Sequence, residues 1–223
     1  MSAPAIQWLG RLEYGWALRL QRARREGVID HGAPEAIWLM EHDPVITTGL
    51  RGVDDLPPPD VLRARGVALY RVERGGLATW HGPGQLVGYL IVDLGRRGLR
   101  VKDVIAGVED GVIAWLASVG VTAGRRDGYP GVWCGREKIC AIGMHFRRGV
   151  SLHGFALNVD PDLSGFDLIV PCGIRDGGVT SVRRQIGRNI DLESCAEAVG
   201  ASVWRSIVDR QRAHVKSVGT PGM

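Results

Sequence analysis

The sequence predicts an α+β fold: a single domain over residues 1–223, with mixed or antiparallel sheets and packed helices. Three observations lead to this prediction. The 223 residues contain no repeat and no low-complexity linker that would divide the chain. Several strand-like segments follow one another closely between residues 132 and 159, and segments with helical spacing precede and follow them. Strands grouped together with a few helices are typical of α+β domains.

The composition disfavours several classes of protein. Hydrophobic residues make up 45% of the chain and charged residues 23%, which is typical of a globular domain and not of a disordered or collagen-like chain. The net charge is only +4 and basic residues alternate with acidic ones, so a nucleic-acid partner is not expected. No apolar run reaches the roughly 18 residues that cross a membrane, and no signal-peptide pattern is present. We therefore expect a cytoplasmic protein with reduced thiols and no membrane partner.

The first half of the chain predicts one helix and three strands. Helical spacing indicates a helix from Tyr14 to Glu26, which Gly27 would end. We expect a solvated face for the arginines of this helix, Arg22, Arg24 and Arg25. Apolar runs predict strands at residues 36–40, ending near Pro44, at 67–72 and at 86–94. The three prolines at residues 57–59 indicate a stiff connector.

The second half predicts two helices around a group of strands. Asp103 is a candidate N-cap for a helix with regularly spaced apolar residues that ends at Gly120. Strands at 132–133, 138–144 and 150–159, separated by short turns, indicate an antiparallel meander. Asp191 would open the last helix, in which Cys195 is expected to pack in the core.

Residues 74–85 join two predicted strands and contain four of the 32 glycines, an arginine and a histidine. Such a loop can bring bare backbone amides close to a substrate. Its glycines do not match the GxGxxG motif, a strand and not a helix follows it, and the chain has no Walker A sequence, so a dinucleotide site is disfavoured. Two interpretations remain: a substrate-binding loop, or a glycine-rich hairpin with a structural histidine.

Cys172 lies between Pro171 and Gly173 at the end of an apolar run, a plausible mount for a nucleophile. The alternative is a buried cysteine that acts as a small hydrophobe. A thiol with a pKa of about 8.5 needs a nearby base or cation to react at neutral pH, and Lys138, His81 and His153 are the candidates. Lys138 is either a surface residue that snorkels or a partly buried amine.

A metal site is not expected from the four cysteines. Cys134, Cys140, Cys172 and Cys195 show no CxxC spacing and no accompanying pair of histidines at zinc-site spacing. The sequence therefore predicts thiols that are either packed in the core or reactive, without a metal ion.

A family resemblance is carried by ordered blocks of sequence. The blocks are RGGLATWHGPGQLVGYLIVDL, GVWCGREKICAIG, RRGVSLHGFALNVDPDLSGF, IVPCGI and TSV, preceded by WLMEHDPVITTG near the N-terminus. In this order they resemble the octanoyltransferases of lipoate biosynthesis, from about Trp38 to Val182. One departure is Ile46, where the family commonly has an aromatic residue, and this leaves the preferred acyl chain length open.

The resemblance implies a fold, a site and partners. The fold would be the one shared by the catalytic domains of biotin and lipoate protein ligases. Cys172 would be the acyl-thioester nucleophile, and Lys138 would lower the pKa of that thiol and shuttle protons. The acyl-substrate pocket would be lined by Arg74, Gly75, Gly76, Leu77, Ala78, Thr79, Trp80, His81, Ala141, Ile142, Gly143, Gly154, Phe155 and Ala156.

The implied reaction moves an octanoyl group from acyl carrier protein to a lysine amine of lipoyl domains. The acceptors would be the lipoyl domains of 2-oxoacid dehydrogenase E2 subunits and the glycine cleavage H protein. No cofactor and no metal are expected, because the thioester is already activated. Two alternatives remain: an ATP-dependent ligase of the same fold that adenylates free lipoate, and a non-catalytic module that binds carrier protein.

Overall fold

The structure is a computed structural model that describes residues 3–50, 56–169 and 177–218. The described strands are β1 (Ala5–Leu12), β2 (Ala36–His42), β3 (Val45–Thr48), β4 (Ala68–Arg71), β5 (Ala78–His81), β6 (Gln85–Ile91), β7 (Gly124–Arg126), β8 (Tyr129–Cys134), β9 (Glu137–Arg147), β10 (Val150–Asn158) and β11 (Gly178–Val179). The described helices are α1 (Tyr14–His31), α2 (Pro59–Ala64), α3 (Leu94–Arg97), α4 (Val101–Ser118), the 3₁₀ helix η1 (Leu163–Leu168), α5 (Val182–Ile186) and α6 (Leu192–Val218).

A large mixed sheet organises the described part of the chain. Its strand order is β1-β2-β6-β10-β9-β8-β7, and β11 pairs with β9 near one end of that strand. The β1–β2 and β9–β11 pairs are parallel, while the other neighbours are antiparallel. A smaller sheet has the order β4-β3-β5. The predicted meander is confirmed by the antiparallel pairing of β8 with β9 and of β9 with β10.

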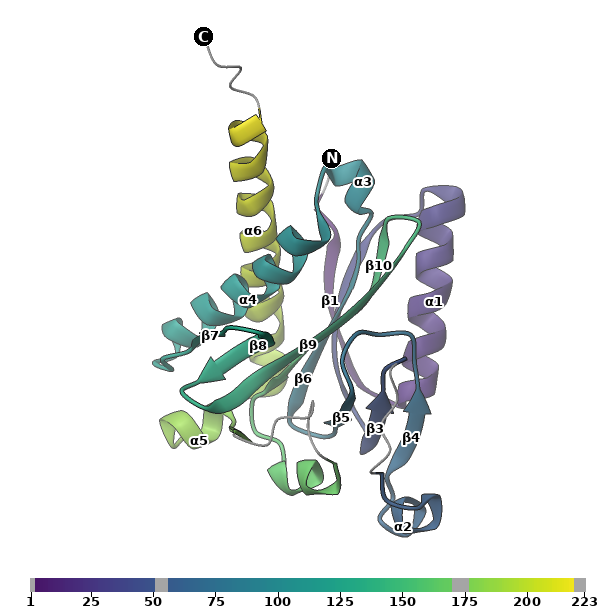
Figure 1. The fold of residues 1–223 in the computed structure, drawn as a ribbon, viewed down its shortest axis with the longest axis vertical. Coiled ribbons are helices and arrows are strands. Elements are labelled where there is room, and N and C mark those ends of the chain that lie inside the picture. Colours follow the sequence, from purple (N-terminus) through teal and green to yellow (C-terminus); the bar gives the residue numbers. More distant parts are fainter. Residues whose placement is uncertain (1–2, 51–55, 170–176, 219–223) are drawn as a thin grey trace.

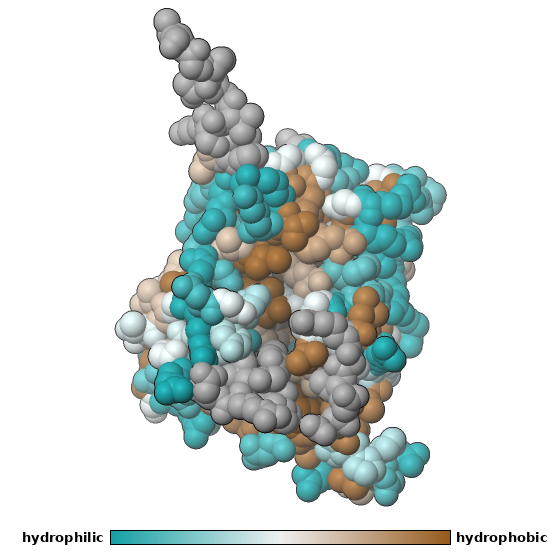
Figure 2. All heavy atoms as spheres, viewed as in Figure 1, coloured by the Kyte–Doolittle hydropathy of each residue, from teal (hydrophilic) through white to brown (hydrophobic). Residues whose placement is uncertain are grey.

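Helices cover both faces of the large sheet (Figure 1). Helices α4 and α6 pack against one face, where they form the largest hydrophobic cluster, and α1 packs against the other. In Figure 2, hydrophilic residues cover the outer side of α1, and hydrophobic residues gather in a band over the middle of the viewed face. The arrangement confirms the expected α+β class, with the mixed sheet between two helical layers.

The strands are buried because both faces of the sheet are covered. In β2, Ile37 and Leu39 point into the cluster with α4 and α6, while Trp38 and Met40 point toward α1. Successive strand residues face opposite sides, so a doubly covered strand reads as a continuous apolar run. This explains why the segments at 36–40 and 86–94 are almost wholly apolar in the sequence.

Two glycines allow α4 and α6 to lie close together. A Cβ atom added to Gly107 would lie 2.6 Å from Ile207 Cγ1, and one added to Gly111 would lie 2.6 Å from the backbone nitrogen of Val203. Gly107 and Gly111 are four residues apart and therefore share one face of the helix. Ser202 Oγ also donates a hydrogen bond of 2.8 Å to the Gly111 carbonyl oxygen.

The expected helix boundaries need two corrections. Helix α1 continues through Gly27 to His31 and ends at Gly32, which has a φ of 61°. Gly27 keeps a helical conformation inside α1, and the helix ends where the left-handed backbone of Gly32 turns the chain out of the hydrogen-bond ladder. Helix α4 begins at Val101, and Asp103 is its third residue, where its carboxylate accepts a 3.1 Å bond from the backbone of Arg100.

Further corrections concern short elements and one arginine. The proline connector is partly helical, because Pro59 opens α2, a position that tolerates a missing N–H. The strand expected over 86–94 ends at Ile91, since Asp93 caps α3. Arg25 is buried and does not lie on a solvated face. Strands β1, β3, β5, β7 and β11 were not anticipated from the sequence. Among the described residues, no helix is long and apolar enough to span a bilayer.

We predict that Gly111→Ala destabilises the protein despite the higher helix propensity of alanine. The added methyl group would collide with the backbone of α6, and overpacking of this kind costs about 2 kcal/mol. Thermal unfolding should show a melting temperature lower by about 6 °C. Gly124→Ala is the matched control, because a Cβ there would meet no atom within 4 Å. An equal or higher melting temperature for Gly111→Ala would contradict the close helix approach.

Candidate active site

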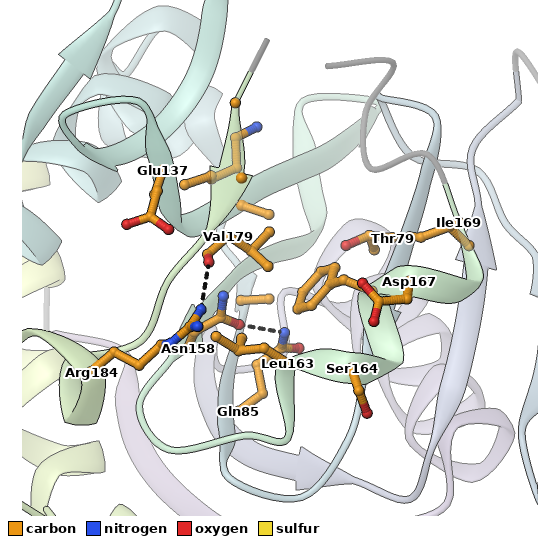
Figure 3. Close-up of a pocket in the computed structure, with 16 residues that line it drawn as sticks. Thr79, Gln85, Glu137, Asn158, Leu163, Ser164, Asp167, Ile169, Val179 and Arg184 are labelled. Carbon is orange, nitrogen blue, oxygen red and sulfur yellow. Dashed lines mark hydrogen bonds between the residues drawn. The ribbon is translucent and has the colours of Figure 1, made fainter. Parts of the chain in front are cut away.

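A cavity of about 520 Å³ lies beside the β9–β11 pair, between η1 and the large sheet (Figure 3). β9 and β10 supply one wall, η1 supplies the opposite wall, and Gly177 to Val179 close one side. The cavity is lined by Thr79, Gln85, Glu137, Lys138, Ala141, Ala156, Asn158, Leu163, Ser164, Phe166, Asp167, Ile169, Gly177, Gly178, Val179 and Arg184.

Lys138 is a buried amine in the wall of this cavity. Its side chain starts on β9, one residue after the turn from β8, and the residue is only 9% exposed. Lys138 Nζ donates a hydrogen bond of 3.2 Å to the carbonyl oxygen of Pro130 and lies 4.8 Å from the centre of the Trp133 ring. A carbonyl dipole and an aromatic face both stabilise a cation. The structure therefore favours the buried-amine alternative over a snorkelling surface residue.

A chain of hydrogen bonds runs beneath the cavity. Gln85 Nε2 donates to Asn158 Oδ1 over 2.9 Å, a bond drawn in Figure 3, and Gln85 Oε1 accepts from His81 Nδ1 over 2.6 Å. Burial lowers the pKa of His81 to about 3, so its ring is neutral. Because Nδ1 holds the proton, Nε2 is left as an acceptor for Thr47 Oγ1 at 3.5 Å. Gln85 thus fixes one tautomer of His81.

A second, narrower cavity of about 50 Å³ adjoins the first. Thr79, Ala141 and Ala156 line both, so the two spaces share a wall. The second cavity extends along β9 and β10 toward α1. It is lined by Tyr14, Arg74, Gly75, Gly76, Thr79, His81, Val87, Tyr89, Ala141, Ile142, Gly143, His153, Gly154, Phe155 and Ala156.

Most of the expected substrate-binding residues therefore meet at one cavity. The exceptions are Leu77, Ala78 and Trp80, which line neither of these two spaces. The reason is the period of β5: alternate residues face the cavity, while Ala78 and Trp80 face a hydrophobic cluster on the other side. Trp80 packs edge-on against Phe166, with 5.5 Å between ring centres.

The loop expected over residues 74–85 is therefore interrupted by a strand. Residues 78–81 form a strand of the small sheet, and only residues 72–77 and 82–84 connect elements. Gly75 donates its backbone N–H to the Met144 carbonyl oxygen over 3.1 Å, which holds the segment against β9. A Cβ atom on Gly143 would lie 3.1 Å from the Gly75 carbonyl oxygen, a tight contact that the bare backbone of glycine avoids.

Several cavity residues have no signal in the sequence. Tyr14 and Tyr89 come from α1 and β6 and meet at the second cavity, and Arg184 of α5 reaches the first. Asn158 gave a weak signal, since it is a polar residue at the end of an apolar strand. The others could not be found by spacing, because their elements are far apart in the chain.

His153 is buried at the second cavity in an unusual backbone conformation. It is 2% exposed, has a φ of 61° in the middle of β10, and its Nε2 atom has no hydrogen-bond partner among the described residues. Burial lowers its pKa to about 3, so it is neutral and carries no charge into the cavity. Strained residues of this kind concentrate at functional sites.

Cys172 lies outside the described residues, which end at Ile169 and resume at Gly177. Both of these residues line the first cavity. The three described cysteines are poor nucleophiles. Burial, together with the Glu137 carboxylate, raises the pKa of the Cys134 thiol to about 11. Burial also raises the pKa of Cys195 to about 12 and that of Cys140 well above its usual range.

No cluster of metal-ligating side chains was found among the described residues of either cavity or elsewhere in that part of the chain. The charged groups at the first cavity are Lys138, Glu137, Asp167 and Arg184. The first cavity therefore offers an amine, backbone amides and the polar side chains of Gln85 and Asn158. It adjoins the narrow second cavity, which is mainly apolar.

Comparison with solved structures identifies the fold. A lipoate protein ligase from T. acidophilum with bound lipoic acid aligns with a TM-score of 0.69 at 18% identity, over 97% of this chain and 96% of that one. Lipoate-protein ligase A bound with ATP aligns with a TM-score of 0.68 at 18% identity, over 94% of each chain. Biotin protein ligase from Aquifex aeolicus aligns with a TM-score of 0.53 at 9% identity, over 96% of this chain and 72% of that one. The expected ligase-like fold is confirmed.

Sequence comparison is more specific. The octanoyltransferase of Chloroflexus aggregans is 42% identical over 212 residues, which cover 91% of this chain and 94% of that protein. The octanoyltransferase of Mycolicibacterium gilvum is 40% identical over 224 residues, which cover 98% and 90%. The family model of the lipoyl protein ligase A/B catalytic domain matches residues 13–203. The chain thus belongs to the lipoyl protein ligase A/B catalytic-domain family and, within it, to the octanoyltransferases.

Proposed function

We propose that this protein transfers an octanoyl group from octanoyl-acyl carrier protein to the lysine amine of lipoyl domains, through a thioester on Cys172. The acceptors are lipoyl domains of 2-oxoacid dehydrogenase E2 subunits and the glycine cleavage H protein, and the reaction takes place in the cytoplasm. The observation that carries the proposal is the buried amine of Lys138 in the wall of a cavity whose edge holds both described neighbours of the Cys172 segment. Similarity to proteins named octanoyltransferase supports the choice of acyl group.

Chain connectivity supports Cys172 as the nucleophile. Cys172 is the third residue after Ile169, and three residues span at most about 10 Å. Ile169, the last described residue before Cys172, and Gly177, the first described residue after it, both line the first cavity. The raised pKa values of Cys134 and Cys195 support the same choice, because a protonated thiol is a weak nucleophile.

The first step forms the acyl-enzyme. Lys138 takes the proton of the Cys172 thiol, and the thiolate attacks the carbonyl carbon of the octanoyl thioester to form a new carbon–sulfur bond. The bond to the phosphopantetheine sulfur breaks, and the leaving thiolate takes the proton from Lys138, which becomes neutral. The ammonium form of Lys138 stabilises the attacking thiolate by its charge. Backbone N–H groups near Gly173 or in the glycine-rich segment donate hydrogen bonds to the oxygen that becomes negative.

The second step transfers the acyl group to the acceptor. The lysine amine of the lipoyl domain attacks the thioester carbon, the amide bond forms, and the bond to Cys172 sulfur breaks. Lys138 in its neutral form accepts the proton that the attacking amine loses, and that proton returns to the departing thiolate. Atoms and charges balance without ATP, a metal or a redox cofactor.

The octanoyl chain is assigned to the second cavity. Val87, Ala141 and Ala156 line it with apolar side chains, and it opens into the larger first cavity. The side chains of Ile142 and Phe155 pack on the other face of the sheet, in the cluster with α4 and α6. Because this space adjoins the cavity that holds Lys138 at the shared residue Ala141, an acyl group can extend from one into the other. The apolar walls bind the alkyl chain equally before and during the reaction, so they contribute mainly to affinity.

The alternative activity is that of an ATP-dependent ligase. A solved ligase of the same fold contains ATP, so the fold alone does not decide between the two. An adenylate mechanism needs no thiol, whereas the transferase uses one. Octanoyl transfer in the absence of ATP and magnesium supports the transferase, and strict dependence on ATP rejects it. A non-catalytic binding module would give no product in either assay.

We predict that an octanoyl adduct accumulates on Cys172 when octanoyl carrier protein is supplied without an acceptor. Intact mass spectrometry with peptide mapping measures it. Cys172→Ser should form no thioester and lose turnover by about a thousandfold or more, because a hydroxyl is a much weaker nucleophile. Cys134→Ser is the matched control and should keep its adduct. Finding the acyl group on Cys134, Cys140 or Cys195 would refute the proposed nucleophile.

We predict that two substitutions of Lys138 separate its effect on the Cys172 thiol from its role in proton transfer. Lys138→Ala removes the positive charge, so the pKa of the Cys172 thiol should rise and the pH profile of iodoacetamide alkylation should move upward by about one pH unit. Lys138→Arg keeps the charge but holds its proton, so alkylation should stay near that of the parent while transfer to the amine acceptor is lost. Lys102→Ala, on the exposed start of α4, is the control. Parental alkylation and turnover in both Lys138 variants would exclude the lysine from the reaction.

We predict that Gly75→Val weakens binding of the octanoyl donor without unfolding the protein. A Cβ on Gly75 has Met144 O, 3.7 Å away, as its nearest neighbour, so the side chain enters open cavity space. The apparent KM should rise about tenfold. Gly76 and Gly84 are poorer probes, because their φ values of 85° and 83° strain any side chain. An unchanged KM in folded Gly75→Val would argue that the chain binds elsewhere.

A further inference from the structure

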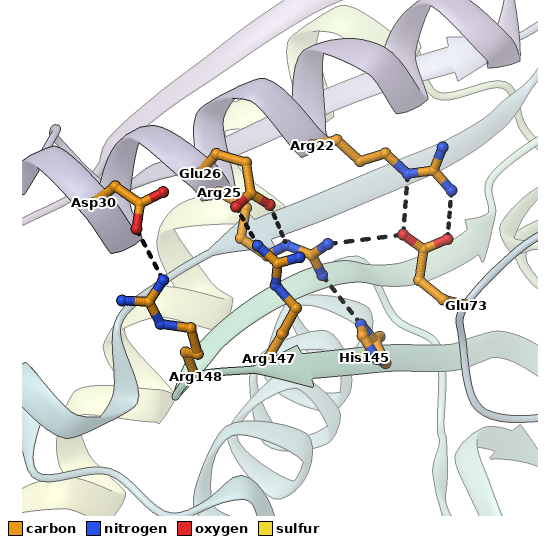
Figure 4. Close-up of polar contacts among 8 residues, drawn as sticks. All are labelled: Arg22, Arg25, Glu26, Asp30, Glu73, His145, Arg147 and Arg148. Carbon is orange, nitrogen blue, oxygen red and sulfur yellow. Dashed lines mark hydrogen bonds and ion pairs between the residues drawn. The ribbon is translucent and has the colours of Figure 1, made fainter.

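Glu73 directly precedes the Arg74-Gly75-Gly76 wall of the second cavity and is not among the residues that line it. Its carboxylate points toward Arg22 of α1 (Figure 4). Arg22 of α1 donates two hydrogen bonds to it, from Nε over 3.0 Å and from Nη2 over 2.6 Å. Two parallel bonds of this kind fix both distance and orientation. The pKa of Glu73 falls to about 2, chiefly because of the Arg22 hydrogen bonds.

Arg25, one helical turn after Arg22, adds a buried charge beside the same carboxylate. Its side chain is 5% exposed, and Nη2 lies 3.8 Å from Glu73 Oε1. Its Nη1 atom lies 3.1 Å from His145 Nδ1 on β9. A guanidinium group has only donors, so neutral His145 accepts this bond. Arg25 Nε also lies 3.7 Å from Glu26 Oε1, but the Glu26 side chain is 41% exposed and that of Glu73 only 21%. Because a less exposed ion pair is less screened by water, Glu73 is the stronger counter-charge for buried Arg25.

The other side of the segment is fixed to the sheets. Gly75 N–H donates to Met144 O over 3.1 Å, one residue before His145. Arg74 Nη2 donates to the Thr47 carbonyl oxygen over 2.6 Å and to Thr47 Oγ1 over 2.9 Å. The cavity wall therefore lies between β3, β9 and α1, and Glu73 makes the contact with α1.

We propose that Glu73 is a positioning residue that, through Arg22 and buried Arg25, holds the Arg74–Gly76 wall at the spacing the octanoyl chain requires. The proposal rests on the proposed function, because it takes the second cavity as the acyl pocket. Glu73 touches no reacting atom. It acts on substrate affinity through the backbone that follows it, and it links the packing of α1 to the width of the pocket.

The same helix carries a matched ion pair that does not reach the cavity. Arg148 Nη1 lies 2.8 Å from Asp30 Oδ1, joining the C-terminal end of α1 to the β9–β10 turn (Figure 4). The side chains of Arg148 and Asp30 are 63% and 44% exposed. Both pairs connect α1 to the β9 side of the molecule, but only the Glu73 pair is next to the pocket wall.

The test compares Glu73→Gln, Arg22→Gln and the control Arg148→Gln in two measurements. Steady-state kinetics of octanoyl transfer give kcat and the apparent KM for octanoyl carrier protein. Amide hydrogen exchange without substrate reports the backbone of residues 74–77. In Glu73→Gln we expect KM to rise about tenfold with kcat nearly unchanged, because the wall contributes equally to ground-state and transition-state binding. Amides 74–77 should exchange faster.

Arg22→Gln leaves the Arg25 contact intact and should show the same changes to a smaller extent, about threefold in KM. Arg148→Gln should change neither KM nor exchange at residues 74–77. Unchanged KM and exchange in Glu73→Gln, or equal changes in Arg148→Gln, would overturn the proposal. The proposal would also be overturned if kcat fell in proportion to the fraction of folded protein, because Glu73 would then only stabilise the fold. If the wild-type protein transfers no octanoyl group, the proposed function fails, and the exchange data alone decide whether Glu73 anchors the wall.

Discussion

The antiparallel pairing of β9 with β10 is the constraint on which the whole site depends. Its register sets Ala141 opposite Ala156 and Gly143 opposite Gly154, so small residues from both strands meet at the same level of the sheet. Lys138 lies near the start of β9, beside the larger cavity. A shift of one residue would turn every one of these side chains to the opposite face. Register thus decides both where the amine lies and where the narrow cavity runs.

Burial on both faces explains how such a site can sit on a stable sheet. The cluster with α4 and α6 supplies packing on one face, and α1 covers part of the other. Glycines allow close backbone approach at several places, two of which have different effects. Gly107 and Gly111 bring α4 onto α6, and Gly154 lies against the carbonyl of Gly88, where any Cβ would collide. The first approach stabilises the layer, while the second leaves space beside the strands for a ligand.

The polar groups around the second cavity are neutral or paired. Burial lowers the pKa values of His81 and His153, so both rings are uncharged at neutral pH. Gln85 orients His81, and Tyr89 packs at 6.4 Å from His153 in an edge arrangement. Neutral rings can border an alkyl chain at less cost than charged groups. Positive charge lies instead on Arg74, at the second cavity, and on Lys138, at the first, where it can act on a thiolate or a carbonyl oxygen.

The sequence by itself determined the longer helices, the strands of the meander and the residue types of the site. Periodicity and apolar runs predicted α4, α6 and the strands of the meander, because local spacing reflects which face is buried. Ordered motifs predicted the family and most of the residues that line the second cavity. Only the tertiary structure decided which members of 74–81 face that cavity, since the two-residue period of β5 turns Trp80 away. It also placed Tyr14, Tyr89 and the Arg22–Glu73 pair at the site, because contacts between residues 51 positions apart depend on packing and leave no trace in local spacing.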